Sequence, residues 1–387
     1  MPIDEIQTVC FVGAGNMGCF NAVKAAISGY RVSLYDLSEE SLQQALSRCE
    51  GIAAFLAGSA YCAAQDVPAA IERISLFSDL GAATTNADLV SESVFERLDI
   101  KRDVLQQLDE ICPEHTILTT NSSYLLLSDM EDAVQRGDRV AALHSYMGSP
   151  LVDILGGART SALTLDILER YVRSLSAVPL LLKKEYPGYV LNALLGQVLG
   201  AAMRLLAEGA GSVEDIDRAW MQHRSAPMGP LGILDLVGLK LVCDSWEQRE
   251  DDGPMPGQRQ RVLNLLKPFV QRNELGMSTG KGFYQYPEPA YQQSGFLEAG
   301  GDLVPLYQPL ELALIAGAAL VAAAGVAEPA DIDKAWRVGT SLDKGPFALL
   351  QEFGPELFVE DFKQYGAAIG FDINKAATVV NYVARLT

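Results

Sequence analysis

The chain has 387 residues, more than one hydrophobic core usually spans, so we expect two or three domains. With 49% hydrophobic and 20% charged residues, the composition is that of an ordinary globular protein and excludes disordered and fibrous classes. The net charge of −19 argues against sequence-independent binding to nucleic acid, which requires a field of the opposite sign.

The cysteines and histidines show no metal-binding pattern. Six cysteines are scattered without a C-x-x-C pair, as expected for small buried side chains in a reducing compartment. Because His115, His144 and His223 share no metal-type spacing with each other or with a cysteine, we predict no metal. The N-terminus resembles neither a signal nor a transit peptide, and the apolar run 312–327 is too short for a comfortable membrane span. We therefore expect a cytoplasmic protein with no membrane partner.

The first half alternates between short β-branched runs and helix-like stretches. The predicted strands cover 8–12, 31–35, 87–90, 116–120, 139–143 and 179–182, and clear helical stretches lie at 16–28 and 97–111. Strands that alternate with helices indicate βαβ units. We predict a doubly wound, mostly parallel α/β sheet over residues 1–184.

A glycine loop follows the first predicted strand. Its sequence, Gly13-Ala-Gly15-Asn-Met-Gly18, leads into a helix, and this context makes the G-x-G-x-x-G pattern a strong sign of a Rossmann-type dinucleotide site. Gly13 allows the tight turn, Gly15 lets the backbone approach a pyrophosphate, and Gly18 lets the helix pack on the sheet. The backbone of Asn16 and Met17 at the helix start should receive the diphosphate without a basic side chain.

Asp36 ends the second predicted strand. Its carboxylate is placed to accept hydrogen bonds from the adenosine ribose hydroxyls, and it would repel a 2′-phosphate. No Lys or Arg directly follows it, so we predict NAD as the cofactor in preference to NADP.

The second half is helical and internally repeated. Asp215-Ile-Asp-Arg-Ala-Trp220 recurs 116 residues later as Asp331-Ile-Asp-Lys-Ala-Trp336, and the same shift relates the Gly-Pro pairs at 229–230 and 345–346. We predict a helical domain at 185–295 and a second helical repeat at 296–387, joined through a linker rich in Pro, Gly and Gln. Their apolar faces should pair as an internal pseudo-dimer, and the chain could also form a homodimer.

Several segments together resemble the 3-hydroxyacyl-CoA dehydrogenase family, nearly from end to end. They are the segment 87–96 with the following Lys101, Thr120-Asn-Ser-Ser123, Pro187-Gly-Tyr-Val-Leu-Asn192, Pro227-Met-Gly-Pro-Leu-Gly232 and Thr279-Gly-Lys-Gly-Phe-Tyr284. The resemblance implies reversible, NAD-dependent oxidation of a 3-hydroxyacyl group to a 3-oxoacyl group, as in fatty acid metabolism. A repeated helical module also has precedent in the longer members of this family.

The resemblance assigns roles residue by residue. His144 would be the general base and Asp153 its partner, Ser123 and Asn192 would hold substrate oxygens, and Asn121, Glu96 and Lys101 would line the nicotinamide side. The chemistry suits these types, because an imidazole with an unperturbed pKa of ~6.5 can take a hydroxyl proton and a carboxylate can fix its tautomer. The alternatives are a core histidine at 144 and helix-capping or turn roles for Ser123, Asn121 and Asn192.

The chain departs from the family pattern at the reacting site. Where the family has H-F-F-N-P, this chain has His144-Ser-Tyr-Met-Gly-Ser-Pro150, so Met147 replaces an asparagine. The family's glutamate becomes Asp153 after a shortened loop, and the arginine expected after Asn192 is Ala193.

The substrate's carrier is a further open question. CoA-dependent members generally carry basic residues on the helical stretch after the second strand, yet no Lys or Arg lies between Arg48 and Arg73. A phosphate at CoA's nucleotide end needs such donors at contact range. We therefore keep three hypotheses: a 3-hydroxyacyl-CoA dehydrogenase, a dehydrogenase of a free 3-hydroxy acid or related small alcohol, and a non-catalytic NAD-binding protein.

Overall fold

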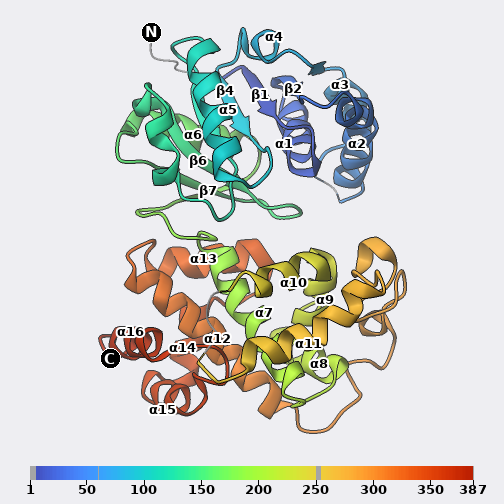
Figure 1. Ribbon diagram of the computed structural model, residues 1–387, viewed down its shortest axis with the longest axis vertical. Coiled ribbons are helices and arrows are strands. Elements are labelled where there is room, and N and C mark those ends of the chain that lie inside the picture. The colour runs from blue at the N-terminus through green and yellow to red at the C-terminus, as the bar shows by residue number, and fades with distance from the viewer. Residues whose placement is uncertain (1–5, 60, 250–253, 387) are drawn as a thin grey trace. The chain divides into compact units, whose positions relative to one another are not determined.

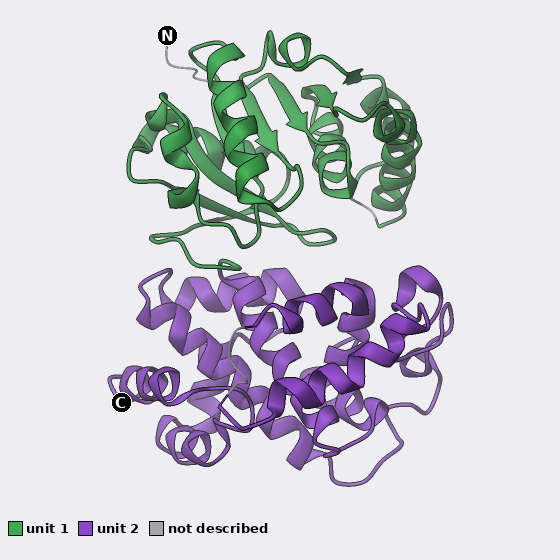
Figure 2. Ribbon diagram, viewed as in Figure 1, with its two compact units in different colours: residues 1–189 green, residues 190–387 purple. Residues whose placement is uncertain are grey.

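A computed structural model describes residues 6–59, 61–249 and 254–386. The chain forms two compact units, residues 1–189 and 190–387 (Figure 2). The first unit is an α/β sheet domain and the second is helical, which confirms the predicted fold class. The proposed boundary between two helical modules near residue 296 stays a prediction.

The first unit is built on an eight-stranded sheet with the order β3-β2-β1-β4-β5-β6-β7-β8 (Figure 1). The strands are β1 Thr8–Val12, β2 Arg31–Tyr35, β3 Ile74–Phe77, β4 Leu89–Glu92, β5 Ile117–Thr120, β6 Val140–Ser145, β7 Leu151–Gly156 and β8 Val178–Leu181. Neighbouring strands are parallel except β6 and β7, which pair antiparallel. The predicted parallel sheet is thus confirmed, with one reversed strand.

The sequence analysis missed two strands. The edge strand β3 is short and alternates irregularly between buried and exposed positions, so its hydrophobic pattern is weak. Strand β7 is fully buried over its first five residues, but it carries Asp153 at its centre. A charged residue inside an apolar run hides the strand signal, because its partners become visible only in the folded structure.

Helices cover both faces of the sheet. They are α1 Asn16–Ile27, α2 Glu39–Gly58, α3 Val67–Ile71, α4 Leu80–Thr84, α5 Leu98–Ile111 and α6 Ala162–Ser174. Side chains of α1, α2 and α6 join one hydrophobic cluster with the sheet, while α4 and α5 contribute to another. Both faces of the strands are therefore buried, as parallel sheets require.

The carboxyl ends of β1, β4, β5 and β6 lie at the same edge because these strands run parallel. The strand order reverses between β1 and β4, and ligands of such sheets bind at this switch point. The glycine loop follows β1, Glu96 lies beyond β4, Ser123 follows β5, and His144 lies near the end of β6. The topology thus gathers the predicted site residues of this unit at one edge.

The second unit consists of helices. They are α7 Leu191–Ala207, α8 Val213–Arg224, α9 Pro230–Val237, α10 Leu239–Glu247, α11 Gln258–Gln271, α12 Val304–Ala323, α13 Pro329–Thr340, α14 Pro346–Phe353, α15 Pro355–Tyr365 and α16 Ile373–Val383. The apolar helix α12 is long enough to cross a membrane by length and composition, but most of it is buried among its neighbours. It packs against α7 and α8 and occupies the core of this unit.

The repeated sequence motif has a structural reason. The Asp217 carboxylate accepts hydrogen bonds from the backbone N–H groups of Leu231 and Gly232 at 2.7 and 2.9 Å, and so caps the start of α9. Asp333, the equivalent residue 116 positions later, accepts from Phe347 and Ala348 at 2.7 and 3.0 Å and caps α14. Each acid therefore satisfies helix N–H groups that would otherwise lack partners.

The glycine before each capped helix is part of the same device. A Cβ at Gly229 would lie 2.3 Å from the Asp217 side chain, and one at Gly345 would lie 2.4 Å from that of Asp333. Only glycine lets the acid approach so closely. The Asp and the Gly-Pro pair therefore recur together because they form one packing unit.

We predict that Asp217→Ala lowers the free energy of unfolding by ~2 kcal/mol or more, because it leaves buried N–H donors unsatisfied. Asp333→Ala should cost less, ~1 kcal/mol, because Asp333 is only half-buried and makes fewer hydrogen bonds. Urea unfolding followed by circular dichroism measures both, with the exposed Asp343→Ala as a control. Equal stability of all three variants would contradict the capping role.

Candidate active site

The glycine loop is tightly packed at Gly13 and Gly18 and open at Gly15. Gly13 has a φ of +106°, and a Cβ there would lie 2.7 Å from the Ser93 carbonyl oxygen. A Cβ at Gly18 would lie 1.8 Å from the Gly13 carbonyl oxygen, whereas nothing lies within 4 Å of the Cβ position at Gly15. Gly13 and Gly18 thus permit the tight turn and the helix packing, and Gly15 borders open space.

The start of α1 fits a diphosphate. Gly15 is the N-cap residue, and no side chain caps this end of the helix among the described residues. Gly15 and Asn16 are exposed and Met17 is half-buried, so their backbone can face a ligand. The helix N–H groups and dipole attract an anion here without a cationic side chain. These residues therefore fit the pyrophosphate of a dinucleotide.

Asp36 supports the loop from the end of β2. Its Oδ2 accepts from the Ala14 N–H and its Oδ1 from the Ser38 N–H, each at 2.8 Å. Arg48 on α2 donates to the Ala14 carbonyl oxygen, so a cation lies against the same loop. Arg48 comes from the next helix, 12 residues after Asp36, so the residues that directly follow Asp36 in the sequence do not reveal it.

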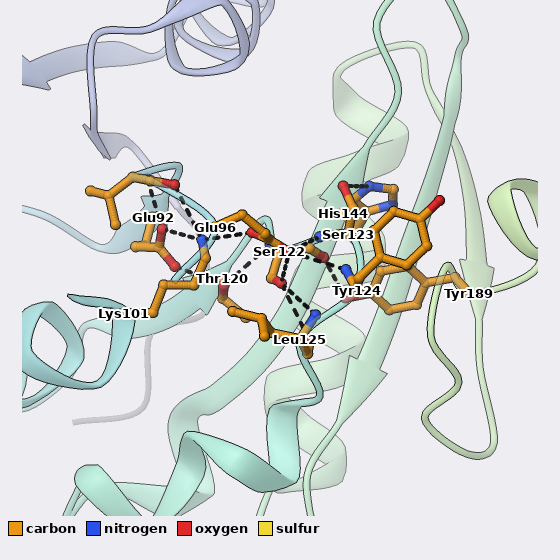
Figure 3. Close-up of polar contacts among 11 residues, drawn as sticks. Glu92, Glu96, Lys101, Thr120, Ser122, Ser123, Tyr124, Leu125, His144 and Tyr189 are labelled. Carbon is orange, nitrogen blue, oxygen red and sulfur yellow. Dashed lines mark hydrogen bonds and ion pairs between the residues drawn. The ribbon is translucent and has the colours of Figure 1, made fainter. Parts of the chain in front are cut away.

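His144 and Asp153 face each other across β6 and β7. They are directly paired in the antiparallel register, and His144 Nδ1 lies 3.1 Å from Asp153 Oδ2. On the other side of the ring, Nε2 lies 3.1 Å from Ser123 Oγ (Figure 3). His144 and Asp153 are buried, whereas Ser123 is half-buried. The three side chains form a continuous hydrogen-bonded chain that ends near the surface.

Two tyrosines that the sequence analysis did not select enclose the imidazole. The Tyr189 ring stacks on His144 with centroids 4.7 Å apart, and its hydroxyl donates to the Ser122 carbonyl oxygen at 2.9 Å (Figure 3). The Tyr146 ring meets His144 edge-on at 4.4 Å. Tyr146 and Tyr189 both lie inside sequence motifs that resemble those of the family. The spacing of residues along the chain, however, does not show how their rings pack.

The Tyr146 hydroxyl donates to Asp153 Oδ2 at 2.6 Å. Burial, and then the negative charge of Asp153, raise the pKa of Tyr146 well above its ordinary value. The phenol therefore keeps its proton near neutral pH and remains a hydrogen-bond donor.

Lys101 lies in a buried ion-pair network rather than on an open surface. Its Nζ lies 2.7 Å from Glu92 Oε1 and 3.3 Å from Glu96 Oε2, and its side chain is 1% exposed (Figure 3). Glu92, which the sequence analysis did not select, also accepts from Thr120 Oγ1 at 2.7 Å. Glu92 thus joins the ends of β4 and β5, with Lys101 paired to it, and a direct contact of Lys101 with nicotinamide stays a prediction.

Glu96 fixes the segment that carries Ser123. Its Oε1 accepts from Ser122 Oγ at 2.6 Å and from the backbone N–H groups of Ser123 and Tyr124 at 3.0 and 3.1 Å. Burial opposes its charge, but the Ser122 hydrogen bond and the charge of Lys101 outweigh burial and lower the pKa of Glu96. The anionic Glu96 therefore holds Ser123 in place for its contact with His144.

The remaining predicted residues are placed as follows. Asn121 is buried, and its Oδ1 accepts from the Ser145 N–H at 2.9 Å, which ties β5 to β6. Asn192 is half-buried in the first turn of α7 in the second unit, with Ala193 beside it. Met147 is 56% exposed in the loop between β6 and β7. The structure thus brings together Ser123, His144 and Asp153, and the substrate contact of Asn192 stays a prediction.

Comparison with known families gives matches along most of the chain. The model described as 3-hydroxyacyl-CoA dehydrogenase, NAD binding domain, matches residues 8–186. The model of the C-terminal domain of the same family matches residues 188–286 and again 310–385. The two matched segments contain the two copies of the repeated motif.

Relatives agree with these matches. The mitochondrial hydroxyacyl-coenzyme A dehydrogenase of Rattus norvegicus is 32% identical over 292 residues, which cover 73% of this chain and 91% of the relative. The probable 3-hydroxybutyryl-CoA dehydrogenase of Bacillus subtilis is 32% identical over 291 residues, which cover 73% of this chain and 99% of the relative.

Two solved structures are similar as well. A diketoreductase that acts on dicarbonyl compounds matches this chain with a TM-score of 0.68 and 35% identity. The match covers 73% of this chain and 100% of the diketoreductase. The 3-hydroxybutyryl-CoA dehydrogenase of Escherichia coli K12 has a TM-score of 0.79 over 99% of this chain and 100% of its own. At 22% identity, this second likeness supports the fold alone.

Asp36 generates a prediction on cofactor choice. Asp36→Ser combined with Leu37→Arg should lower the ratio of kcat/KM for NAD over NADP by ~10-fold or more, because it exchanges a repelling carboxylate for a charge-assisted phosphate contact. Leu37 is 84% exposed, so the arginine has room. Steady-state kinetics with both cofactors measure the ratio, and equal kcat/KM in the unmodified protein would contradict the role of Asp36.

Proposed function

Because the chain belongs to the 3-hydroxyacyl-CoA dehydrogenase family, we propose that Ser123, His144 and Asp153 are its reacting site. The protein is an NAD-dependent oxidoreductase of this type, which interconverts 3-hydroxyacyl and 3-oxoacyl groups.

His144 is the general base of the proposed reaction. Its Nε2 faces Ser123 Oγ at the half-buried end of the hydrogen-bonded chain, where a substrate hydroxyl can approach. Nε2 takes the hydroxyl proton, while bound NAD supplies the hydride acceptor. Asp153 holds the proton on Nδ1, which leaves the Nε2 lone pair free, and stabilises the imidazolium that forms.

Ser123 and Asn192 are proposed to hold the substrate oxygens. Ser123 is suited to this role because Glu96 anchors its backbone and its hydroxyl already contacts Nε2. Asn192 offers an amide at the start of α7. Asn121, Glu96 and Lys101 would support the nicotinamide side, with Lys101 acting through the two glutamates that surround it.

The hydrogen bond between His144 and Asp153 is the observation that carries the catalytic proposal. Asp153 is buried at the centre of β7, and its Oδ2 lies within hydrogen-bond reach of His144 Nδ1. The pairing argues against the non-catalytic alternative, even though Asp replaces the glutamate of the family pattern.

A substrate without CoA is a second candidate, and two observations favour it. Arg48 donates to backbone oxygen in the glycine loop, and Arg73 donates to the Ala26 and Ala69 carbonyl oxygens at 3.3 and 3.1 Å. Between these two arginines the chain has no Lys or Arg for a CoA phosphate. The similar diketoreductase acts on dicarbonyl compounds, which supports a free carbonyl substrate for this chain too.

We further propose that the two helical repeats pair as an internal pseudo-dimer. The packing of α7 against α12 supports it, because the repeat shift relates these helices, and the double match of the C-terminal family model supports it as well. A homodimer and a cytoplasmic location remain predictions.

Substitution of the proposed dyad tests the mechanism. His144→Ala should lower kcat by ~10²–10⁴-fold, because general-base catalysis contributes that much. Asp153→Asn should also lower kcat, since it favours the wrong tautomer of the ring. Initial rates of NAD reduction, with circular dichroism to verify folding, measure both effects. Normal turnover by both folded variants would show that the dyad is not the reacting site.

Comparison of thioesters decides the substrate class. We expect kcat/KM for acetoacetyl-CoA to exceed that for the N-acetylcysteamine or pantetheine ester only slightly, because no basic residue between Arg48 and Arg73 can bind the nucleotide end. NADH oxidation assays with the esters and free acetoacetate give the comparison. A large advantage of the full CoA ester would show that basic contacts elsewhere bind it.

A further inference from the structure

Tyr146 is a buried side chain that touches both members of the dyad. It lies just beyond the end of β6 and is 8% exposed. Its hydroxyl lies 2.6 Å from Asp153 Oδ2, and its ring packs edge-on against His144. Tyr146 has no role in the proposed mechanism, although it contacts both His144 and Asp153.

The two oxygens of the Asp153 carboxylate differ in their hydrogen bonds. Oδ2 accepts from Tyr146 and is the oxygen that faces His144 Nδ1, whereas Oδ1 is buried without a partner among the described residues. A carboxylate can rotate about its Cβ–Cγ bond and exchange its oxygens. A second donor, held by a buried ring, restrains this rotation and keeps one carboxylate oxygen between the phenol and the imidazole.

We propose that Tyr146 is a positioning residue, whose hydroxyl fixes the Asp153 carboxylate and sets how strongly the dyad holds a proton. This inference rests on the proposed function of His144 and Asp153. Tyr146 acts on the reaction through Asp153, and its hydroxyl is already committed to that carboxylate.

The direction of the effect follows from charge. A donated hydrogen bond draws negative charge from the carboxylate, so Asp153 attracts the imidazolium less strongly when Tyr146 is present. Removing the hydroxyl should make the dyad more basic. Besides Asp153, the titratable groups whose charges bear on Tyr146 are Tyr189 and Tyr124, and those that bear on Tyr189 are Glu96, Glu185 and Glu92. They are the same in the wild type and the variant, so they do not account for a difference between the two.

Tyr146→Phe in the full chain tests the proposal, because it keeps the ring and removes only the hydroxyl. We expect the acidic limb of kcat/KM for 3-hydroxybutyryl-CoA oxidation with NAD to move upward by about one pH unit, so that activity on the acidic side falls about tenfold. The KM for NAD should stay unchanged. The matched control is Tyr30→Phe, which removes a hydroxyl that contacts Ser174 in the same unit and should leave the profile in place.

A double-mutant cycle separates positioning from a general loss of stability. If Tyr146 acts through Asp153, Tyr146→Phe should add little to the effect of Asp153→Asn. Additive losses in kcat/KM, or an unchanged pH profile in folded Tyr146→Phe, would overturn the proposal.

Nuclear magnetic resonance gives a readout that needs no substrate. The chain has three histidines, so His144 can be assigned by comparison with His144→Ala in histidine-labelled protein. Its ring should titrate at higher pH in Tyr146→Phe than in the wild type, and the same midpoint in both would overturn the proposal. An inactive wild type with a shifted titration would refute the proposed function while supporting the role of Tyr146.

Discussion

The antiparallel pairing of β6 and β7 is the constraint on which the contact between His144 and Asp153 depends. His144 and Asp153 are direct partners in that register, so their side chains project from the same face of the sheet. A slip of one residue would turn Asp153 to the opposite face and break the contact. The neighbouring pairs, Leu143 with Ile154 and Ala142 with Leu155, are apolar and buried, and their packing holds the register. The geometry of the proposed dyad is thus stabilised by ordinary core residues.

In this strongly negative protein, the backbone rather than a cationic side chain fits an anionic cofactor. At the loop after β1, helix N–H groups and the open space beside Gly15 fit a pyrophosphate. Cations near this edge are used for other purposes. Lys101 neutralises Glu92 and Glu96, and Arg48 binds a loop carbonyl. The positive side chains therefore shape the site, and the fixed dipoles of the backbone are left to meet the ligand.

The sequence predicted what depends on local pattern. The strands β1 and β2 agree with the predicted ranges 8–12 and 31–35. Strand β1 is a fully buried apolar run before the glycine loop, and β2 alternates between more and less buried positions, so both have a clear local pattern. The convergence of Ser123 and His144 was predictable from the rule that parallel strands end at one edge. Glu92, Tyr146 and the neighbour Arg48 were missed because their importance comes from contacts across elements. The pattern of residues along the chain does not show that the Tyr146 hydroxyl lies 2.6 Å from the Asp153 carboxylate.

Three departures from the family pattern meet at one point in the structure. The loop after His144 is shortened, the acid is one methylene shorter, and a tyrosine occupies the second aromatic position of the H-F-F-N-P motif. The short loop belongs to the β6–β7 hairpin that sets Asp153 directly opposite His144. At that distance, 3.1 Å, the shorter acid suffices to reach Nδ1. The tyrosine hydroxyl then supplies a donor to a buried carboxylate that would otherwise have a single partner. Read separately, each change weakens the resemblance at the reacting site. In the structure, however, the shorter acid and the tyrosine belong to one hydrogen-bonded arrangement, in which Asp153 Oδ2 faces His144 Nδ1 and accepts from the Tyr146 hydroxyl.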